Sequence, residues 1–95
     1  MIIWNKRAEN SLDKITNYIG KHFSQKEEDV FVIQVLETLT AIAEFPKAYP
    51  ETKLLKGARK AVIHPHSTLF YRIDSKKKIR LLLFWDNRNN PRKLK

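Results

Sequence analysis

The chain has 95 residues, a net charge of +9 and no cysteine. This length predicts a single domain over residues 1–95 that buries one core without disulfides, and the missing cysteines exclude disulfides and thiolate metal sites. The first residues are too short an apolar run for a signal peptide, and no segment approaches a membrane span, so we expect a cytoplasmic protein with no membrane contact.

The start of the chain predicts a short strand followed by a helix. The apolar residues 2–4 are ended by Asn5, a residue type that favours the N-cap of a helix. Apolar residues then recur with the spacing of one helical face: Ala8, Leu12, Ile15 and Ile19. Gly20 is expected to end this helix.

A second helix is predicted from a capping box, in which Ser24 and Glu27 have the required spacing. Pro46 disfavours helical angles at Phe45, so the helix should end there. Its expected inward stripe is Val32, Leu36, Leu39 and Ala43, widened by Phe31, Val35 and Ile42. A helix this apolar is either deeply packed or keeps one face for a partner.

Three runs rich in β-branched and aromatic residues within residues 61–85 predict three strands. The turn 74–78 should make the last two strands a hairpin, and the corner 64–67 should join the first two. The run 79–85 is apolar at nearly every position, which indicates a central strand covered on both faces. We therefore expect an α+β fold, with two N-terminal helices packed on one face of a small, mainly antiparallel sheet in the order β-α-α-β-β-β.

Strict alternation along the last two strands predicts which side chains face the helices. The expected helix-side residues are Leu69, Tyr71, Ile73, Leu81, Leu83 and Trp85. The opposite face would then carry Phe70, Arg72, Arg80, Leu82 and Phe84. Two interpretations stay open for that face: apolar packing with arginines at its rim, or a basic groove with an aromatic floor that stacks bases and binds phosphate.

Positive charge is concentrated in the second half of the chain. Residues 1–50 carry six Lys and Arg against seven Asp and Glu, a net of −1, whereas residues 51–95 carry thirteen against three, a net of +10. This asymmetry favours a polyanionic partner, either nucleic acid or an acidic protein segment, and a solvated lysine face stays open as the alternative. The candidate binding cations are Lys53, Lys60, Arg72, Arg80, Arg92 and Lys93.

The order of short motifs along the chain resembles the RelE/ParE superfamily of type II toxins. The motifs are Arg59-Lys60 at a strand start, 70–73 (Phe-Tyr-Arg-Ile) in the next strand, and Asp86-x-Arg88-x-x-Pro91 after the last one. The resemblance covers nearly the whole chain. It implies a toxin that a cognate antitoxin neutralises. The toxin would act either by cleaving mRNA on the ribosome, as RelE-like members do, or by poisoning DNA gyrase, as ParE-like members do. The alternative is a non-toxic, basic nucleic-acid-binding module.

The resemblance also implies site residues. Metal-independent RNA cleavage can use the 2′-hydroxyl of the substrate, so it needs a base, an acid and cations but no cofactor or metal. By position, Lys53 and Lys56 resemble the loop lysines of RelE-like enzymes, Arg59 the arginine at their strand start, and Arg88 the arginine after their last strand. With His66 as acid or base, the candidate catalytic set is Arg59, Arg88, Lys56 and His66.

Simpler roles remain open for the same residues. The two arginines can pair with carboxylates such as Asp74 or Asp86, although we expect both to be exposed and to serve the target rather than the fold. Histidines in a corner, such as His64 and His66, are more often surface hydrogen-bonding residues than catalytic ones. The tail 91–95 contains no counterpart of the C-terminal tyrosine of RelE-like members, which favours a ParE-like activity.

Overall fold

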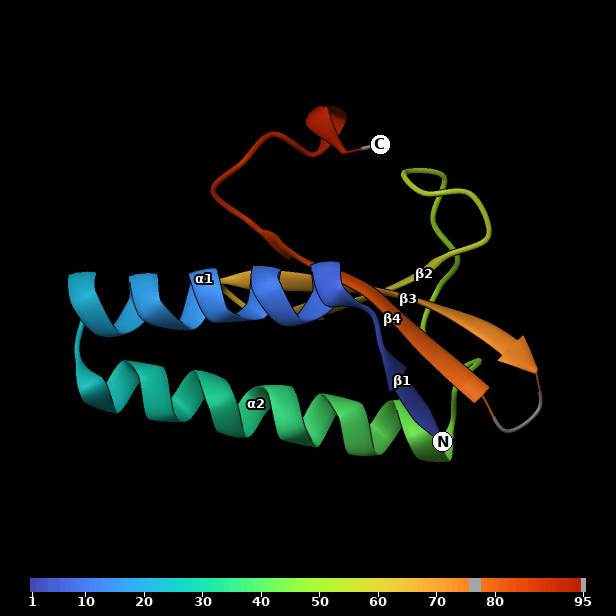
Figure 1. Cartoon of the computed structure of the whole chain (residues 1–95), viewed down its shortest axis with the longest axis horizontal. Coiled ribbons are helices and arrows are strands. Elements are labelled where there is room, and N and C mark those ends of the chain that lie inside the picture. The colour runs from blue at the N-terminus through green and yellow to red at the C-terminus, as the bar shows by residue number, and fades with distance from the viewer. Residues whose placement is uncertain (76–77, 95) are drawn as a thin grey trace.

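The computed structural model describes residues 1–75 and 78–94, so Lys76 and Lys77 of the predicted turn lie outside the described residues. Its elements follow the expected order (Figure 1). They are β1 (Ile2–Trp4), α1 (Lys6–His22), α2 (Gln25–Glu44), β2 (Arg59–Ile63), β3 (Ser67–Ser75), β4 (Lys78–Asp86) and the short 3-10 helix η1 (Pro91–Lys93).

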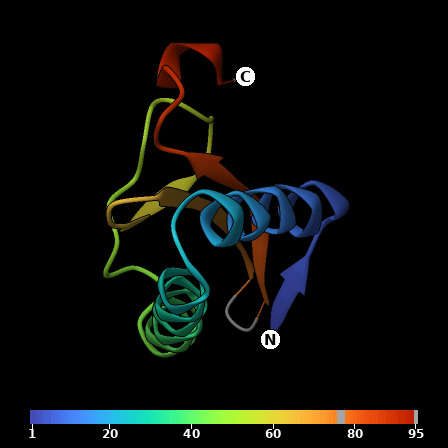
Figure 2. The same ribbon diagram turned by 90° about the vertical axis from the view of Figure 1, so that its left-hand side faces the viewer.

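The strands form one mixed sheet in the order β1-β4-β3-β2. β3 pairs antiparallel with both β2 and β4, while β1 pairs parallel with β4. Both helices cover the same face of this sheet, as the end-on view in Figure 2 shows. The α+β prediction is therefore confirmed, including the inner position of β4, whose apolar sequence is explained by neighbours on both edges and side chains packed on both faces.

Both predicted N-caps are present. The Asn5 side chain accepts a hydrogen bond from the Ala8 amide at 2.7 Å, and the Ser24 hydroxyl accepts one from the Glu27 amide at 3.0 Å. Each bond satisfies a backbone donor that the first turn of a helix leaves free. α2 ends at Glu44, as its proline-containing end predicts. Within the described residues, no helix has the length and apolar character needed to cross a membrane.

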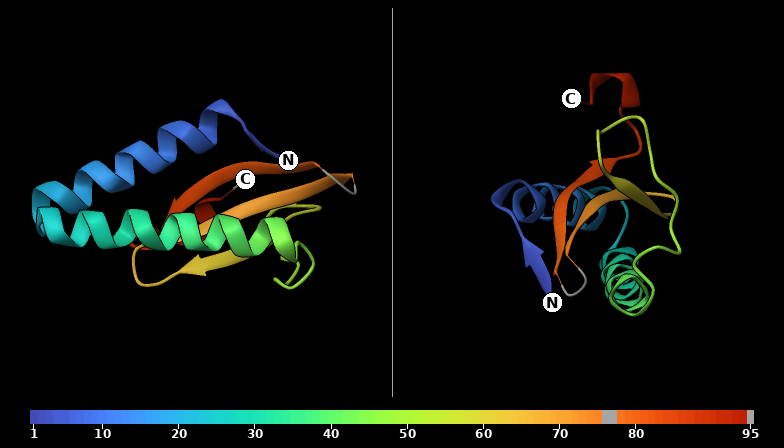
Figure 3. Two further views of the ribbon diagram at one scale, coloured as in Figure 1. Left: turned by 90° about the horizontal axis from the view of Figure 1, so that it is seen from below. Right: turned by 90° about the vertical axis from the view of Figure 1, so that its right-hand side faces the viewer.

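Gly20 does not end α1, because the helix continues to His22. A Cβ atom built on Gly20 would lie 2.0 Å from Oε1 of Glu28 in α2. The Glu28 carboxylate therefore occupies the space beside Gly20 that a side chain would fill, near the connection where Figure 3 shows the two helices converging.

The inward face of α2 differs from the predicted one. Phe31, Val35 and Ile42 are buried, whereas Leu36 is 58% exposed. Val32 and Ala43 are exposed as well. The predicted main stripe was wrong because apolar residues occupy neighbouring positions around much of this helix, so their spacing alone cannot choose between adjacent faces.

The hydrophobic side chains pack in two clusters, one on each face of the sheet. The helix-side cluster includes Leu69, Tyr71, Leu81 and Phe84, and the cluster on the opposite face has Phe70, Leu83 and Leu94 at its centre. Leu55 and Trp85 pack against the second cluster. The predicted facing of β3 is confirmed, but Leu83, Phe84 and Trp85 of β4 face opposite to the prediction.

A β-bulge in β4 explains this reversal. Phe70 pairs with Leu83 and the next residue, Tyr71, pairs with Leu81, so Leu82 is an extra residue between them. An extra residue shifts the alternation by one and moves every later side chain to the other face. The ring of Phe84 consequently stacks on Trp4 on the helix side, with 5.7 Å between ring centroids.

α1 takes over the free edge of β4 where β1 ends. β1 pairs with β4 only as far as Trp4 and Leu81. Further along, the Phe84 amide donates to the Ser11 hydroxyl at 2.9 Å, and that hydroxyl donates to the Arg7 carbonyl at 2.7 Å. One serine thus satisfies a strand amide that no neighbouring strand reaches.

Candidate functional site

Arg59, expected on the surface, is largely enclosed. Its side chain is 20% exposed and its Nη1 donates to the carbonyl oxygens of Tyr49 at 2.7 Å and Lys47 at 3.3 Å. The nearby Glu51 lies 3.9 Å from Nη2 and is itself almost fully exposed. Arg59 therefore holds the segment that follows α2 against the start of β2, a role in the fold that the expectation of an exposed arginine missed.

Tyr71 completes this anchor. It pairs with Arg59 across β2 and β3, and its buried hydroxyl donates to the Pro46 carbonyl at 2.6 Å. Burial raises the pKa of Tyr71 to about 12, although the Arg59 charge opposes the rise and Tyr49 adds to it. The neutral phenol is consequently the form that the fold stabilises, which suits packing rather than proton transfer near neutral pH.

Arg88 is paired, as the simpler alternative for this residue proposed. Its Nε lies 3.1 Å from both carboxylate oxygens of Asp86, and its guanidinium carbon sits 3.5 Å from the centre of the Tyr18 ring. Burial alone would raise the pKa of Asp86, but hydrogen bonds from the Arg88 side chain and backbone outweigh it, so the pKa lies below its usual range. Asp86 stays ionised and fixes Arg88 over α1.

Two clefts open on either side of this Arg88 pair, and Ile15, Tyr18, Asp86 and Arg88 line both. The smaller, about 290 Å³, also contains His66, whose ring meets Phe23 and Phe31 edge-on with centroids 5.4 and 5.9 Å apart. The larger cleft, about 730 Å³, is bordered by three cations: Arg7, Lys14 and Arg88. A lining that combines these cations with apolar side chains such as Ile15 and Phe84 suits an anionic or amphipathic ligand.

The four candidate catalytic residues fall into two groups at opposite ends of β2. Arg59 begins β2, and Lys56 lies on the exposed loop just before it. His66 lies beyond the other end, where its carbonyl accepts from the Asn87 amide, one residue from Arg88. Four residue steps along a strand span about 13 Å. This separation does not gather the four residues around one phosphate. Their catalytic roles stay a prediction.

Arg72 and Arg80 pair directly across β3 and β4 and share one carboxylate. Nε of Arg72 donates to Oδ1 of Asp74 at 3.1 Å, and Nε of Arg80 donates to Oδ2 at 2.8 Å. Hydrogen bonds from Arg80 and then Arg72 hold the pKa of Asp74 below its usual value. Both arginines were predicted on the face of the sheet that lacks helices, but Asp74 was considered as a partner of Arg59 or Arg88 instead. The alternating spacing of Arg72 and Asp74 on one strand was the signal for the pair.

The remaining predicted cations surround the face of the sheet that lacks helices. Lys60 borders a hollow of about 250 Å³ with Phe70 and Trp85, which gives that face the mixed cationic and aromatic character expected. Lys53, Arg92 and Lys93 are exposed on the loop before β2 and on the C-terminal segment. The two segments meet through Leu55 and Leu94 and cover part of the sheet.

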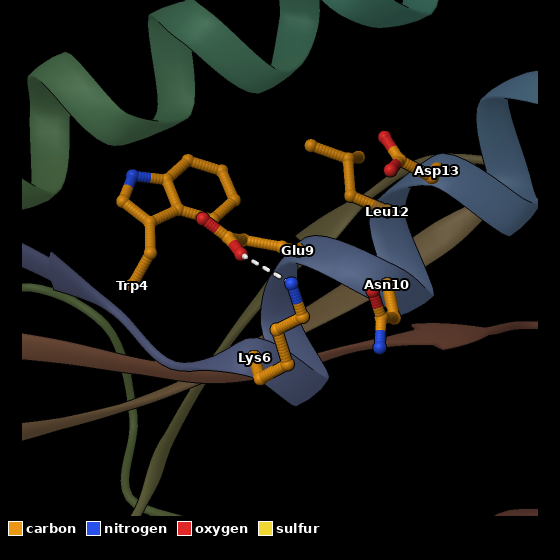
Figure 4. Close-up of a pocket in the computed structure, with 6 residues that line it drawn as sticks. All are labelled: Trp4, Lys6, Glu9, Asn10, Leu12 and Asp13. Carbon is orange, nitrogen blue, oxygen red and sulfur yellow. Dashed lines mark ion pairs between the residues drawn. The ribbon is translucent and has the colours of Figure 1, made fainter.

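A further hollow lies away from every predicted site residue. Figure 4 shows it beside Trp4 and the first turns of α1, with the exposed Lys6–Glu9 ion pair at 4.0 Å across its mouth. An exposed pair of this kind contributes little and offers no convergent chemistry. Within residues 1–75 and 78–94, no three side chains of the His, Cys, Asp and Glu types gather closely enough to hold a metal.

Solved structures share this fold. The chromosomal ParDE system of P. aeruginosa superimposes with a TM-score of 0.75 at 15% identity, covering 90% of this chain and 92% of that one. A YoeB/ParE toxin from Agrobacterium tumefaciens gives 0.60 at 13% identity, with coverage of 90% and 96%. YafQ from E. coli gives 0.57 at 17% identity, with 93% of each chain covered. No curated protein sequence matches the chain.

The chain thus has the fold of these solved structures. A family model described as "ParE toxin of type II toxin-antitoxin system, parDE" matches residues 2–91. The chain therefore belongs to the ParE toxin family, and it is the toxin of a type II toxin–antitoxin system. The resemblance seen in the motifs is confirmed.

Proposed function

We propose that this toxin arrests growth by binding DNA gyrase and inhibiting it, as the ParE-like branch of the superfamily does, and that it does not cleave mRNA. The observation that carries the proposal is the separation of the candidate catalytic residues. Arg59 and Lys56 lie at one end of β2, and His66 and Arg88 lie at the other. General acid–base cleavage requires its groups within hydrogen-bond reach of the same phosphate.

The bonding of the two arginines supports the same conclusion. A cation that stabilises a developing phosphorane must be able to turn its donors toward it. Arg59 gives Nη1 to backbone carbonyls, and Arg88 gives its Nε edge to Asp86. A toxin that works by binding needs no such convergence, because a protein–protein interface spreads its contacts over many residues on each side.

The test compares both activities with one preparation of the toxin. Purified toxin is added to gyrase with relaxed plasmid, and separately to a reconstituted translation system whose mRNA ends are mapped. We expect supercoiling to fall with toxin concentration and transcripts to stay intact, and addition of the antitoxin should restore supercoiling. Transcripts cut on the ribosome, together with unaffected supercoiling, would overturn the proposal.

We also propose which surface the cognate antitoxin covers. The E. coli protein YafQ has been crystallised with DinJ as a toxin–antitoxin complex. In the present chain, α2 exposes Ile33 and Leu36, and a hollow of about 500 Å³ lies between Leu36, Leu39 and Ile2. Exposed apolar side chains on one helix suit the apolar face of an amphipathic segment. Acidic residues in the same segment would neutralise the basic sheet half.

This surface can be tested by coexpression with the small protein encoded beside the toxin. Ile33→Ser and Leu36→Ser should reduce copurification of the antitoxin, because both side chains are exposed and their removal leaves the core intact. Phe23→Ser, at an apolar residue of similar exposure at the end of α1, is the matched control and should copurify normally. Unchanged binding by the α2 variants would show that the antitoxin lies elsewhere.

A further inference from the structure

We propose that Arg72 and Arg80 form a binding site for the phosphodiester backbone of a nucleic acid, held in position by Asp74. This site lies on the face of the sheet that lacks helices and near the β3–β4 hairpin, apart from the Arg88 clefts. It would give the toxin a direct affinity for nucleic acid, whether or not gyrase is its target.

The facing of the two arginines follows from their neighbours in the strands. Tyr71 and Ile73 pack on the helix side, so Arg72 between them points to the opposite face. Ile79 and Leu81 flank Arg80 in the same way. Because Arg72 and Arg80 pair directly across the two strands, their side chains run alongside each other.

Asp74 fixes the pair while leaving most of its donors available. Each guanidinium uses only Nε on the carboxylate, and among the described residues neither has another hydrogen-bond partner. The side chains of Arg72 and Arg80 are 48% and 36% exposed. Their Nη groups therefore form a preset double fork open to solvent, the geometry that binds phosphate through paired hydrogen bonds.

The loop before β2 supports the site from its other side. Gly57 has φ of 76°, in the left-handed region, and a Cβ atom there would lie 3.8 Å from Cδ of Arg72. The Gly57 loop thus lies beside the aliphatic stem of Arg72. A fork that Asp74 already holds in place loses less side-chain entropy when it binds an anion.

The surrounding charge selects a polyanion over a small anion. Between Thr52 and Lys95 the only acidic residues are Asp74 and Asp86, and both are paired with arginine. Lys78 shares the face of Arg80 by alternation and is exposed. Lys56 lies next to Gly57 in the loop, and Lys60 lies on β2. A row of cations around a bidentate fork matches the repeated charge of a nucleic-acid backbone.

The test measures binding of fluorescent 20-base-pair duplex DNA and 20-nucleotide single-stranded RNA to the free toxin, by anisotropy between 50 and 200 mM salt. The double variant R72Q/R80Q should lose about 10- to 100-fold in affinity near 0.1 M salt, and its salt slope should fall by about two, since two phosphate contacts are removed. Lys21→Gln with Lys26→Gln is the control, because it removes the same charge from exposed residues near the α1–α2 connection, at the far end of the molecule in Figure 1.

A second variant separates the fork from charge alone. R72K/R80K keeps both charges but cannot form paired hydrogen bonds, so it should recover only part of the affinity. Tighter binding of DNA or of RNA identifies the source of the phosphodiester. The proposal is overturned if R72Q/R80Q binds like the control, if R72K/R80K binds like the unaltered protein, or if a polyglutamate peptide binds in place of both nucleic acids. The assay contains neither gyrase nor ribosomes, so its outcome is independent of the proposed function.

Discussion

Replacing Arg59 with alanine should destabilise the fold rather than only remove a surface charge. The guanidinium donates at 2.7 Å to the Tyr49 carbonyl and at 3.3 Å to the Lys47 carbonyl, and its side chain is largely enclosed. A hydrogen bond from a charged donor contributes about 1.5–3 kcal/mol. The contact with exposed Glu51 adds almost nothing. We therefore expect a loss of about 2 kcal/mol.

The assay is thermal unfolding of free toxin, separated from its coexpressed antitoxin in denaturant and refolded. For a domain of this size, a loss of about 2 kcal/mol corresponds to a drop in Tm of roughly 8–16 °C. Arg59→Lys should give an intermediate value, because it keeps the charge but not the planar set of donors. Lys60→Ala, at the neighbouring position on the opposite face of the sheet, should stay within about 0.5 kcal/mol.

One result would refute this reasoning. If Arg59→Ala unfolds at the temperature of the unaltered toxin and yet has lost its toxicity, then Arg59 engages a target and the two carbonyl bonds contribute nothing to the fold. Reduced toxicity that follows the fall in Tm, with the residual folded fraction fully active, is the expected pattern.

Three further predictions test other contacts. Tyr71→Phe should cost about 1–2 kcal/mol through the lost bond to the Pro46 carbonyl. The folded-state pKa of Tyr71 is raised to about 12, so its contribution to the free energy of unfolding is complete below pH 10 and declines as the pH rises toward 12. Denaturant melts of the phenylalanine variant should therefore show a weaker loss of stability at alkaline pH. Ser11→Ala should cost about 1–3 kcal/mol in urea unfolding by leaving the Phe84 amide without its partner, whereas the exposed Ser75→Ala should not. Phe84→Ala should cost about 3–5 kcal/mol, since this ring is buried on the helix side, and a cost below about 1 kcal/mol would contradict this burial.

Local signals predicted much of the fold. The caps at Asn5 and Ser24 depend on a side chain and an amide three residues away, so neighbouring residues carry all the information. The inner position of β4 followed from its apolar sequence, which few other environments tolerate. Element order and α+β class rest on signals of this local kind.

Features that depend on distant residues could not be predicted in the same way. The bulge at Leu82 arises from pairing with β3 and has no marker such as glycine in β4 itself. Gly20 is a residue type that commonly follows a helix end, whereas the Glu28 side chain that lies over it belongs to a later segment. The carbonyls bonded by Arg59 lie in a loop without periodicity, so no pattern indicated that they would surround this arginine.

The parallel pairing of β1 with β4 affects when this toxin can fold during its synthesis. Ile2 pairs with Ile79, so the first strand to leave the ribosome has no partner until almost the whole chain has followed. Contacts between distant residues form late because a long loop must close first. The complete sheet, and any surface that depends on it, therefore arises only after β4 is free. An antitoxin made at the same place and time can meet the nascent toxin before that surface exists.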